Sequence, residues 1–439
     1  MKKTPLEDWI VNRTGIAAGN QTELEAYQLK KILETMDYAR KNSAFYKNHL
    51  AAIGPGTINS LDDVKNIPFT AAEALQKAPY SFVCVPQQKI DRIVTLNTSG
   101  TNGERKRLFF TEQDLERTVD FFNYGMRSLT DRSDRVLVLL PGNTYGSIGD
   151  LLKKALTLSG VPCTVFGLLT DLDEVEKTIE ANKITCIVGI PIQVLYLSRM
   201  KSDVFKRRIR KLLLSTDYVP ATMVDELHRK FNCQVFTHYG MTEMGYGGGV
   251  ECEAQNGYHL READLYVEIV DPYSGAPVEN GEYGEVVFTS LTREAMPLIR
   301  YRTGDIAAFS EKSCPCGTFL RTLKKVEGRF NNRIKLDDDA FLELKRLDEM
   351  ILRFEEIVDY QAVLEDDNRL NIEIALYDES HDARIKEQLS TMIQEYIKNS
   401  FSIALEVNVN TNQEKKPNQL KNSMFKRKIY DMRKERRNE

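Results

Sequence analysis

The sequence predicts an α/β protein: a large N-terminal domain with mostly parallel sheets plus a small β-subdomain, and a smaller α+β C-terminal domain. Between residues 135 and 236, short apolar runs alternate with helical patterns, which indicates a parallel sheet covered on both faces. From residue 265 the pattern changes to short strands separated by turns. A chain of 439 residues also exceeds the usual size of one domain. We therefore expect domains at residues 1–328 and 329–439, the second ending in a basic tail.

The first fifty residues are expected to be largely helical. Apolar side chains recur at helical spacing between residues 29 and 36. Residues 42–46 break this pattern, and residues 54–56 form a turn. Residues 60–64, which read SLDDV, are suited to capping another short helix.

Individual helices and strands can be predicted in the region between residues 135 and 236, where the two patterns alternate. Helices are expected at residues 115–126, 148–158, 193–200 and 223–231. Strands are expected at residues 135–140, 163–166, 185–191, 212–216 and 234–236. In such sheets, ligands bind beyond the carboxyl ends of the strands.

Composition and charge limit the kinds of partner. The hydrophobic fraction of 42% and the charged fraction of 28% are typical of a soluble globular protein. A net charge of -4 favours neither a nucleic-acid partner nor a membrane partner. No apolar signal segment follows the first residues, and no apolar run approaches the roughly 18 residues of a spanning helix. We therefore expect a cytoplasmic protein.

The most distinctive stretch is residues 97–106, NTSGTNGERK, which lies between strand-like runs at 90–96 and 107–110. Glycine lets the backbone approach a ligand closely. Peptide N–H groups, hydroxyls and a lysine suit an anion such as a nucleotide phosphate. The loop is not a Walker A motif, because that motif has a different spacing and opens a helix. The alternative is a polar hairpin loop.

This loop resembles the phosphate loop of adenylate-forming enzymes, which reads roughly [ST]-S-G-[ST]-T-G-x-P-K. The resemblance assigns cofactor binding to Thr98, Ser99, Gly100, Thr101 and Gly103, and a catalytic role to Lys106. Asn102 and Arg105 stand where threonine and proline are usual. Three further motifs of the family match downstream in the same order.

The second motif follows the strand at 234–236, which runs directly into YGMTE. It resembles the Y-G-x-T-E motif of the family, which implies that Tyr239 and Gly240 bind the cofactor. The tyrosine ring offers a stacking face for adenine. The resemblance makes Thr242 and Glu243 catalytic, the first toward the α-phosphate and the second as an Mg²⁺ ligand. The alternative is a strand-end turn with an exposed acid.

The third motif follows strands expected at residues 265–270 and 284–290, which form the small β-subdomain. The sequence YRTGD at residues 301–305 resembles a family motif without departure. In this resemblance Asp305 belongs to the cofactor site, since a carboxylate can accept bonds from both ribose hydroxyls. The alternative is a solvated aspartate in a β-turn.

The fourth stretch, EGRFNNRIK, resembles G-R-x-D-D-x-x-K, the hinge between the two domains of the family. Gly328, Arg329 and Lys335 match, whereas Asn331 and Asn332 replace the usual acids. The resemblance places Arg329 and Lys335 at the cofactor, with the arginine as a fork for ribose or phosphate oxygens. The alternative is an exposed interdomain arginine.

Beyond the hinge, the pattern predicts a compact α+β domain. Its strands are expected at residues 362–364, 372–376 and 405–409, and its helix at residues 383–398. The family carries an adenylation lysine near its C-terminus, usually just after a glycine. Alignment on Asp431 puts Phe425 at that position with no preceding glycine, and Lys426 is the nearest replacement.

Seven cysteines are scattered along the chain and do not suggest a disulfide framework. Three lie in or beside apolar runs and are expected in the core: Cys163, Cys186 and Cys233. Cys252, His259, Cys314 and Cys316 flank the β-subdomain and offer the donors that structural Zn²⁺ prefers. Similar positions occur in phenylacetate–CoA ligase-like proteins. The alternatives are loop cysteines without a ligand, or one reactive thiol.

The four motifs and the N-terminal region together resemble those of the phenylacetate–CoA ligase-like group. The resemblance implies an AMP-forming acid–thiol ligase that uses ATP, Mg²⁺ and coenzyme A with a carboxylic acid. Aryl acids are among the candidate substrates, and a homodimer is left open. One alternative is an adenylating enzyme with another acceptor, such as a carrier-protein thiol. The other is a nucleotide-binding protein that has lost turnover. Candidate acyl-pocket residues are Tyr145, His238, Gly240 and the glycines at 247–249.

Overall fold

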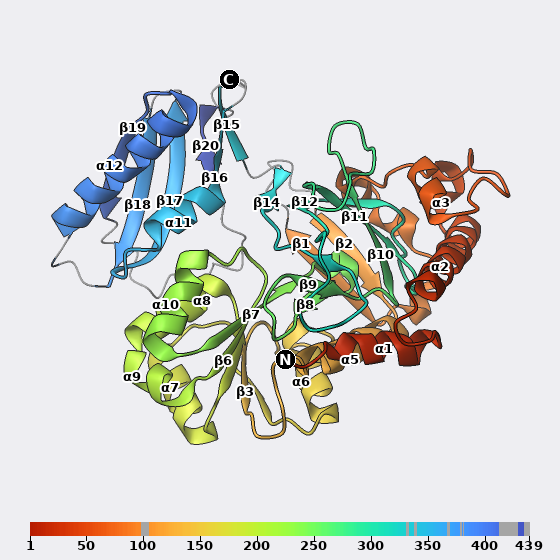
Figure 1. Ribbon diagram of the computed structural model, residues 1–439, viewed down its shortest axis with the longest axis horizontal. Helices are drawn as coiled ribbons and strands as arrows, with labels where there is room; N and C mark the ends of the chain where they lie inside the picture. Colours follow the sequence, from red (N-terminus) through yellow and green to blue (C-terminus); the bar gives the residue numbers. More distant parts are fainter. Residues whose placement is uncertain are drawn as a thin grey trace. The chain divides into compact units, whose positions relative to one another are not determined.

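The computed structural model describes residues 1–97, 105–330, 333–337, 340–366, 369–377, 380, 382–411 and 429–433 (Figure 1). The chain forms two compact units. The first unit contains Met1–Ser133, Pro141–Pro162 and His238–Glu327, and the second contains Asp134–Leu140, Cys163–Thr237 and Gly328–Glu439. The chain passes into the second unit for the last time after Glu327. The domains at residues 1–328 and 329–439 stay a prediction.

The helices of the first unit begin and end at clear local signals. They are α1 (Pro5–Thr14), α2 (Gln21–Asn42), α3 (Ala44–His49), α4 (Ala72–Lys77), α5 (Glu112–Met126) and α6 (Ile148–Leu158). The Thr4 side chain caps α1, and Pro5 occupies its first position, where no backbone donor is lost. Ser43 ends α2 and caps α3, which confirms the predicted break. The short 3₁₀ helices are η1 (Leu61–Asn66), η2 (Pro79–Phe82), η3 (Gln87–Lys89) and η4 (Thr242–Met244).

The strands of the first unit pair antiparallel. They are β1 (Arg92–Asn97), β2 (Arg105–Phe110), β8 (Gly249–Glu251), β9 (Tyr258–Leu260), β10 (Leu265–Val270), β11 (Gly284–Ser290), β12 (Tyr301–Ala307) and β13 (Thr322–Leu323). β1 pairs with β2, β11 lies between β10 and β12, and β9 lies between β8 and β13. The two strands expected on either side of residues 97–106 and the small β-subdomain are therefore confirmed.

The second unit contains the parallel sheet, in the order β7-β6-β5-β3-β4. Its strands are β3 (Val136–Leu139), β4 (Cys163–Val165), β5 (Cys186–Gly189), β6 (Lys211–Leu214) and β7 (Gln234–Tyr239), the last of which ends in the first unit. Its helices are α7 (Leu172–Asn182), α8 (Pro191–Met200), α9 (Ser202–Arg208) and α10 (Ala221–Phe231). The predicted strand at 185–191 is too long, because Pro191 starts α8. The helices α7 and α9 were not expected.

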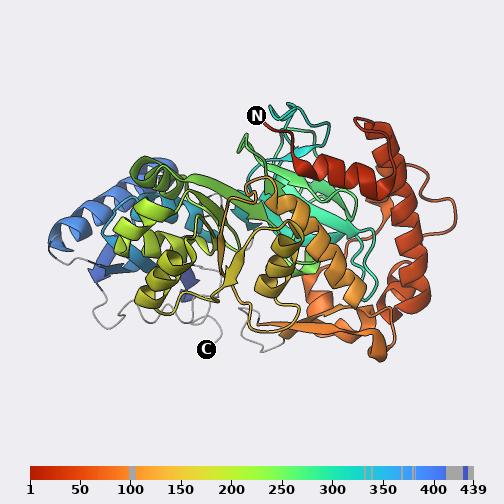
Figure 2. The ribbon, with the colours of Figure 1, turned by 90° about the horizontal axis from the view of Figure 1, so that it is seen from below.

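The C-terminal part of the second unit is the predicted α+β fold. Its elements are β14 (Gly328–Arg329), β15 (Arg333–Asp337), β16 (Ala340–Glu343), α11 (Leu344–Ile351), β17 (Ile357–Asp366), β18 (Arg369–Leu376), α12 (Asp382–Phe401), β19 (Glu406–Thr411) and β20 (Tyr430–Asp431). The sheet order is β19-β18-β17-β20. α12 packs on it through Ile385, Leu389, Ile393 and Ile397, which recur every four residues and are buried (Figures 1 and 2).

This C-terminal part is joined to the parallel sheet within the same unit. Arg199 of α8 is buried, pairs with Glu226 at 2.6 Å and donates to the main-chain carbonyls of Leu352 and Ile357. Glu349 accepts hydrogen bonds from backbone N–H groups at the start of α10, where the helix dipole favours an acid. In the part of the chain that the structure describes, no helix is long and apolar enough to cross a bilayer.

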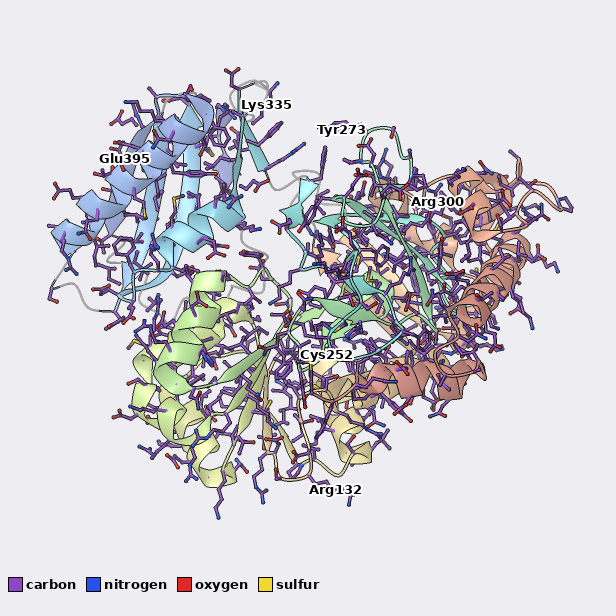
Figure 3. The ribbon with its side chains drawn as sticks, in the orientation of Figure 1. Arg132, Cys252, Tyr273, Arg300, Lys335 and Glu395 are labelled. Carbon is purple, nitrogen blue, oxygen red and sulfur yellow. The ribbon has the colours of Figure 1, made fainter. Side chains whose placement is uncertain are left out.

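A buried arginine ties the N-terminal segment of the first unit to its antiparallel sheet. Arg300 is 1% exposed, and its guanidinium donates to both carboxylate oxygens of Glu268 at 3.1 Å (Figure 3). It also donates to the carbonyls of Lys65 and Ile67 and lies over the Phe69 ring. One side chain thus satisfies a buried acid and two main-chain carbonyls at the end of η1 that would otherwise be orphaned.

We predict that Arg300→Leu lowers the free energy of unfolding by about 3–5 kcal/mol, because Glu268 is left charged and unpaired in the interior. The double variant Arg300→Leu/Glu268→Leu should lose less than Arg300→Leu alone. Denaturant unfolding followed by circular dichroism measures both. The exposed pair Arg207–Glu180 is the control, and Arg207→Ala should change the value by less than about 1 kcal/mol. A double variant no better than the single one would refute this account.

Candidate functional site

A buried ion pair joins two of the predicted motifs in the first unit. Lys106, on β2, donates from Nζ to Glu243 Oε1 at 2.6 Å. The same ammonium donates to the Tyr301 hydroxyl of β12 at 2.9 Å. The lysine and glutamate side chains are only 13% and 5% exposed, so the pair is largely desolvated. Charges removed from water in this way interact more strongly than on a surface.

A bulge in β12 positions the predicted ribose carboxylate. Between the pairs Glu285–Ile306 and Val287–Arg302, one residue of β11 faces three residues of β12. Gly304 lies inside the bulge with φ +75°, a conformation that glycine adopts without strain. Its N–H donates to the Glu285 carboxylate at 2.9 Å, which holds the irregular backbone in place.

The bulge turns Asp305 toward the strand that carries the second motif. The Tyr239 hydroxyl donates to Asp305 Oδ2 at 3.1 Å. Asp305 lies within a strand and is only 6% exposed, so it is not a solvated aspartate of a turn. The second and third motifs thus meet in one place, as the resemblance implied.

Close packing explains why residue 240 is glycine. A Cβ there would lie 2.9 Å from the Gly247 Cα and 2.9 Å from His238 Cε1, distances that side chains do not adopt. Thr242 opens η4 and is partly buried beside the buried Glu243. The tight turn after β7 therefore presents the threonine and glutamate next to each other.

The glycines at 247–249, which the sequence offers as pocket residues that leave room or expose backbone, have no open space beside them. Their place in an acyl pocket stays a prediction. A Cβ on Gly247 would lie 2.5 Å from a Phe121 ring carbon, one on Gly248 2.7 Å from Met244 Sδ, and one on Gly249 2.9 Å from the His259 carbonyl oxygen. The space beside each glycine is filled by protein atoms, since interiors are close-packed.

The two other acyl-pocket candidates differ in environment. His238 is half-buried, and the shielding of its imidazole from water lowers the pKa of the ring to about 4, so the ring is neutral at pH 7. Tyr145 is half exposed, and a hydrogen bond to Asp91 raises the pKa of its phenol to about 12. Both side chains are therefore uncharged near pH 7.

The predicted metal-binding side chains lie together in the first unit. The ligand atoms of Cys252, His259, Cys314 and Cys316 all lie within 4.8 Å of one another, and all four residues are buried (Figure 3 labels Cys252). Cys252 Sγ is 3.6 Å from Cys314 Sγ, and Cys316 Sγ is 3.5 Å from His259 Nε2. Burial raises the pKa of Cys252 and lowers that of His259 to about 4. Three sulfurs and one imidazole nitrogen fit a closed tetrahedral site.

Several predicted residues fall elsewhere. Those outside the described part of the chain are Thr98, Ser99, Gly100, Thr101, Gly103, Asn331, Asn332 and Lys426. Arg329, on β14, and Lys335, on β15 (Figure 3), belong to the second unit. Their roles stay predictions.

Two residues of the site have no assigned role in the sequence analysis. Tyr301 bonds to Lys106, and its presence in YRTGD was the one available signal. Arg293, in the loop after β11, donates to the Glu243 carbonyl at 3.0 Å and to the Phe109 carbonyl at 3.3 Å. A single loop arginine gives no pattern that sequence reasoning could detect.

Comparisons with known proteins identify the family of this chain. The family model described as AMP-binding enzyme matches residues 41–292. Phenylacetate-coenzyme A ligase of Aromatoleum evansii is 27% identical over 412 residues, which cover 90% of this chain and 92% of that protein. The Thermus thermophilus protein of the same name is 29% identical over 332 residues, which cover 71% of this chain and 72% of that protein.

A solved structure shares the fold. The chain resembles 2-hydroxyisobutyryl-CoA ligase in the postadenylation state, with a TM-score of 0.80, 17% identity and coverage of 96% of this chain and 93% of that one. The family model covers more than half of the sequence. The chain therefore belongs to the AMP-binding enzyme family, and it is a phenylacetate–CoA ligase-like member of these adenylate-forming proteins.

Proposed function

We propose that the protein is an AMP-forming acid–CoA ligase. The observation that carries the proposal is the buried contact of Lys106 with Glu243 and Tyr301, in a chain of the adenylate-forming family. In the first half-reaction a carboxylate oxygen attacks the α-phosphorus of ATP, and the bond to pyrophosphate breaks. In the second, the sulfur of coenzyme A attacks the acyl carbon, and AMP leaves. The relatives named above support this pair of steps.

In this scheme, the residues of the first unit position charged and polar groups next to the phosphates of ATP. The carboxylate substrate is already a nucleophile, so no general base is needed in the first half-reaction. Lys106 neutralises phosphate oxygens, and Thr242 donates its hydroxyl to the α-phosphate. Glu243 would hold Mg²⁺, which supplies further neutralisation of the triphosphate when bound. The triphosphate of ATP offers several acceptors to Lys106. We therefore expect Lys106 to exchange its contact with Glu243 for contacts with phosphate oxygens when ATP binds.

The remaining predicted residues keep the roles that the family resemblance implies. The phosphate-loop residues Thr98, Ser99, Gly100, Thr101 and Gly103 would surround the triphosphate. Tyr239 and Gly240 would face adenine and Asp305 the ribose, while Arg329 and Lys335 would contact the cofactor from the hinge. The cytoplasmic location and the possible homodimer stay predictions.

Two alternatives have distinct outcomes. An adenylating enzyme with a carrier-protein acceptor would catalyse ATP–pyrophosphate exchange but reject free coenzyme A. A protein that has lost turnover would bind ATP without exchange. A panel of aryl, arylacetic and aliphatic acids in a pyrophosphate-release assay, with and without coenzyme A, identifies the acid and separates the three cases.

We predict that Glu243→Ala and Asp305→Ala each reduce the rate of ATP–pyrophosphate exchange by about 10²-fold or more. The first variant removes the proposed Mg²⁺ ligand, and the second removes the proposed contact with the ribose. The exposed acid Asp62 provides the control, and Asp62→Ala should keep wild-type exchange. Circular dichroism checks that the fold is intact. Near wild-type exchange in both site variants, with an acid that the wild type accepts, would show that the site is misassigned.

We predict that Lys426→Ala suppresses adenylation more strongly than Lys421→Ala or Lys428→Ala. The reason is that Lys426 is the nearest cation to the position of the family's adenylation lysine. Exchange rates of the three variants are compared at saturating ATP. Equal and slight effects would remove Lys426 from the mechanism and favour the alternative with reduced turnover.

We predict about one zinc per chain, held by Cys252, His259, Cys314 and Cys316 as a closed structural site. Cys314→Ser should lose the metal and lower the temperature of unfolding, because metal binding contributes to folding. Cys163→Ser, outside the cluster, is the matched control. Elemental analysis is done on protein purified without a histidine tag or added metal. A folded, active and zinc-free wild type would exclude the site.

A further inference from the structure

Arg293 connects the two segments that carry the charged pair of the candidate site. Its Nη1 donates to the main-chain carbonyl of Glu243 at 3.0 Å, and its Nη2 to that of Phe109 at 3.3 Å. Phe109 lies on β2, three residues after Lys106. One guanidinium thus bonds to the backbone on both sides of the Lys106–Glu243 contact.

The backbone beside Arg293 is held in place. The Asp114 carboxylate accepts hydrogen bonds from the N–H groups of Glu294 at 2.8 Å and Ala295 at 3.0 Å. On the other side, the Thr292 hydroxyl donates to Asp264 Oδ1 at 2.7 Å. The loop that presents the guanidinium is therefore anchored before and after it.

The bonding of this guanidinium is unusual for a shielded cation. Two of its N–H groups donate to main-chain carbonyls. Burial lowers the pKa of the guanidinium, and the nearby carboxylates of Asp114 and Glu243 offset this effect only in part. Its Nε is buried without a hydrogen-bond partner. Removing a cation from water without satisfying all of its donors opposes folding. A contribution to stability is therefore a weak explanation for an arginine at position 293.

Arginine is suited to joining two acceptors. Its planar fork presents several donors in a fixed geometry, whereas a lysine ammonium is a single point on a flexible stem. The guanidinium also lies over the Phe110 ring, 4.1 Å from the centroid, which fixes its plane. Both features restrict how the two carbonyls move relative to each other.

We propose that Arg293 is a positioning residue for adenylation: it sets the separation of β2 from η4 and thereby keeps Lys106 and Glu243 in register. This inference rests on the function proposed above. It concerns the half-reaction in which the triphosphate is present. Thioester formation from an acyl adenylate does not involve the pyrophosphate group, so it should depend less on Arg293.

The test compares Arg293→Lys and Arg293→Met with wild type in both half-reactions. We expect ATP–pyrophosphate exchange to fall about 10-fold or more in kcat, which corresponds to the loss of one or two charge-assisted hydrogen bonds. Thioester formation from pre-formed acyl adenylate and coenzyme A should change less than about 3-fold. Arg321→Lys is the control, since Arg321 also stacks on a phenylalanine and donates to a carbonyl. It should leave both rates unchanged.

Equal losses in the two half-reactions, or no loss in exchange, would overturn the inference. A wild type without exchange would instead overturn the proposed function. Hydrogen exchange then tests Arg293 without turnover. Backbone amides at residues 105–110 and 242–245 should exchange faster in both variants, while those of α2 keep wild-type rates. Unchanged protection at these segments would refute the inference, and faster exchange throughout would indicate a merely structural role.

Discussion

The ion pair between Lys106 and Glu243 is the contact on which the arrangement of the first unit depends. Two charges this far from water are tolerated only with good geometry and additional partners. Tyr301 supplies one such partner through its hydroxyl. The hairpin β1–β2, the turn η4 and strand β12 come from distant parts of the sequence, yet they must converge within about 3 Å for these hydrogen bonds to form. Such preorganised charge is what phosphoryl chemistry uses.

The cysteine and histidine cluster is linked to the same region through paired strands. His259 lies on β9, which pairs with β8, and β8 pairs in turn with the end of β7, where Tyr239 lies opposite Gly249. A metal bound at the cluster would therefore stiffen strands that pair with the end of β7, next to η4. Glu7 of α1 adds a further tie, since its carboxylate accepts the Thr318 hydroxyl two residues after Cys316.

The parallel sheet and the C-terminal α+β part share one compact unit, although a long stretch of sequence separates them. Arg199 provides part of the reason, because its guanidinium replaces water for carbonyls at Leu352 and Ile357. Glu349 provides another, since it satisfies orphan N–H groups at the start of α10. Apolar periodicity cannot reveal such joins, because each one uses isolated polar residues.

The sequence by itself determined the types and order of most elements, because apolar periodicity and turn residues act locally. It also determined the chemistry available at YGMTE, YRTGD and the cysteine–histidine set. Only the tertiary structure decided how these parts meet: the bulge that turns Asp305 toward Tyr239, the role of Tyr301, and the bond from Arg293 to Glu243. It also filled the space beside Gly247 with Phe121. These features depend on contacts between residues far apart in the chain, and a pattern of neighbouring residues does not contain them.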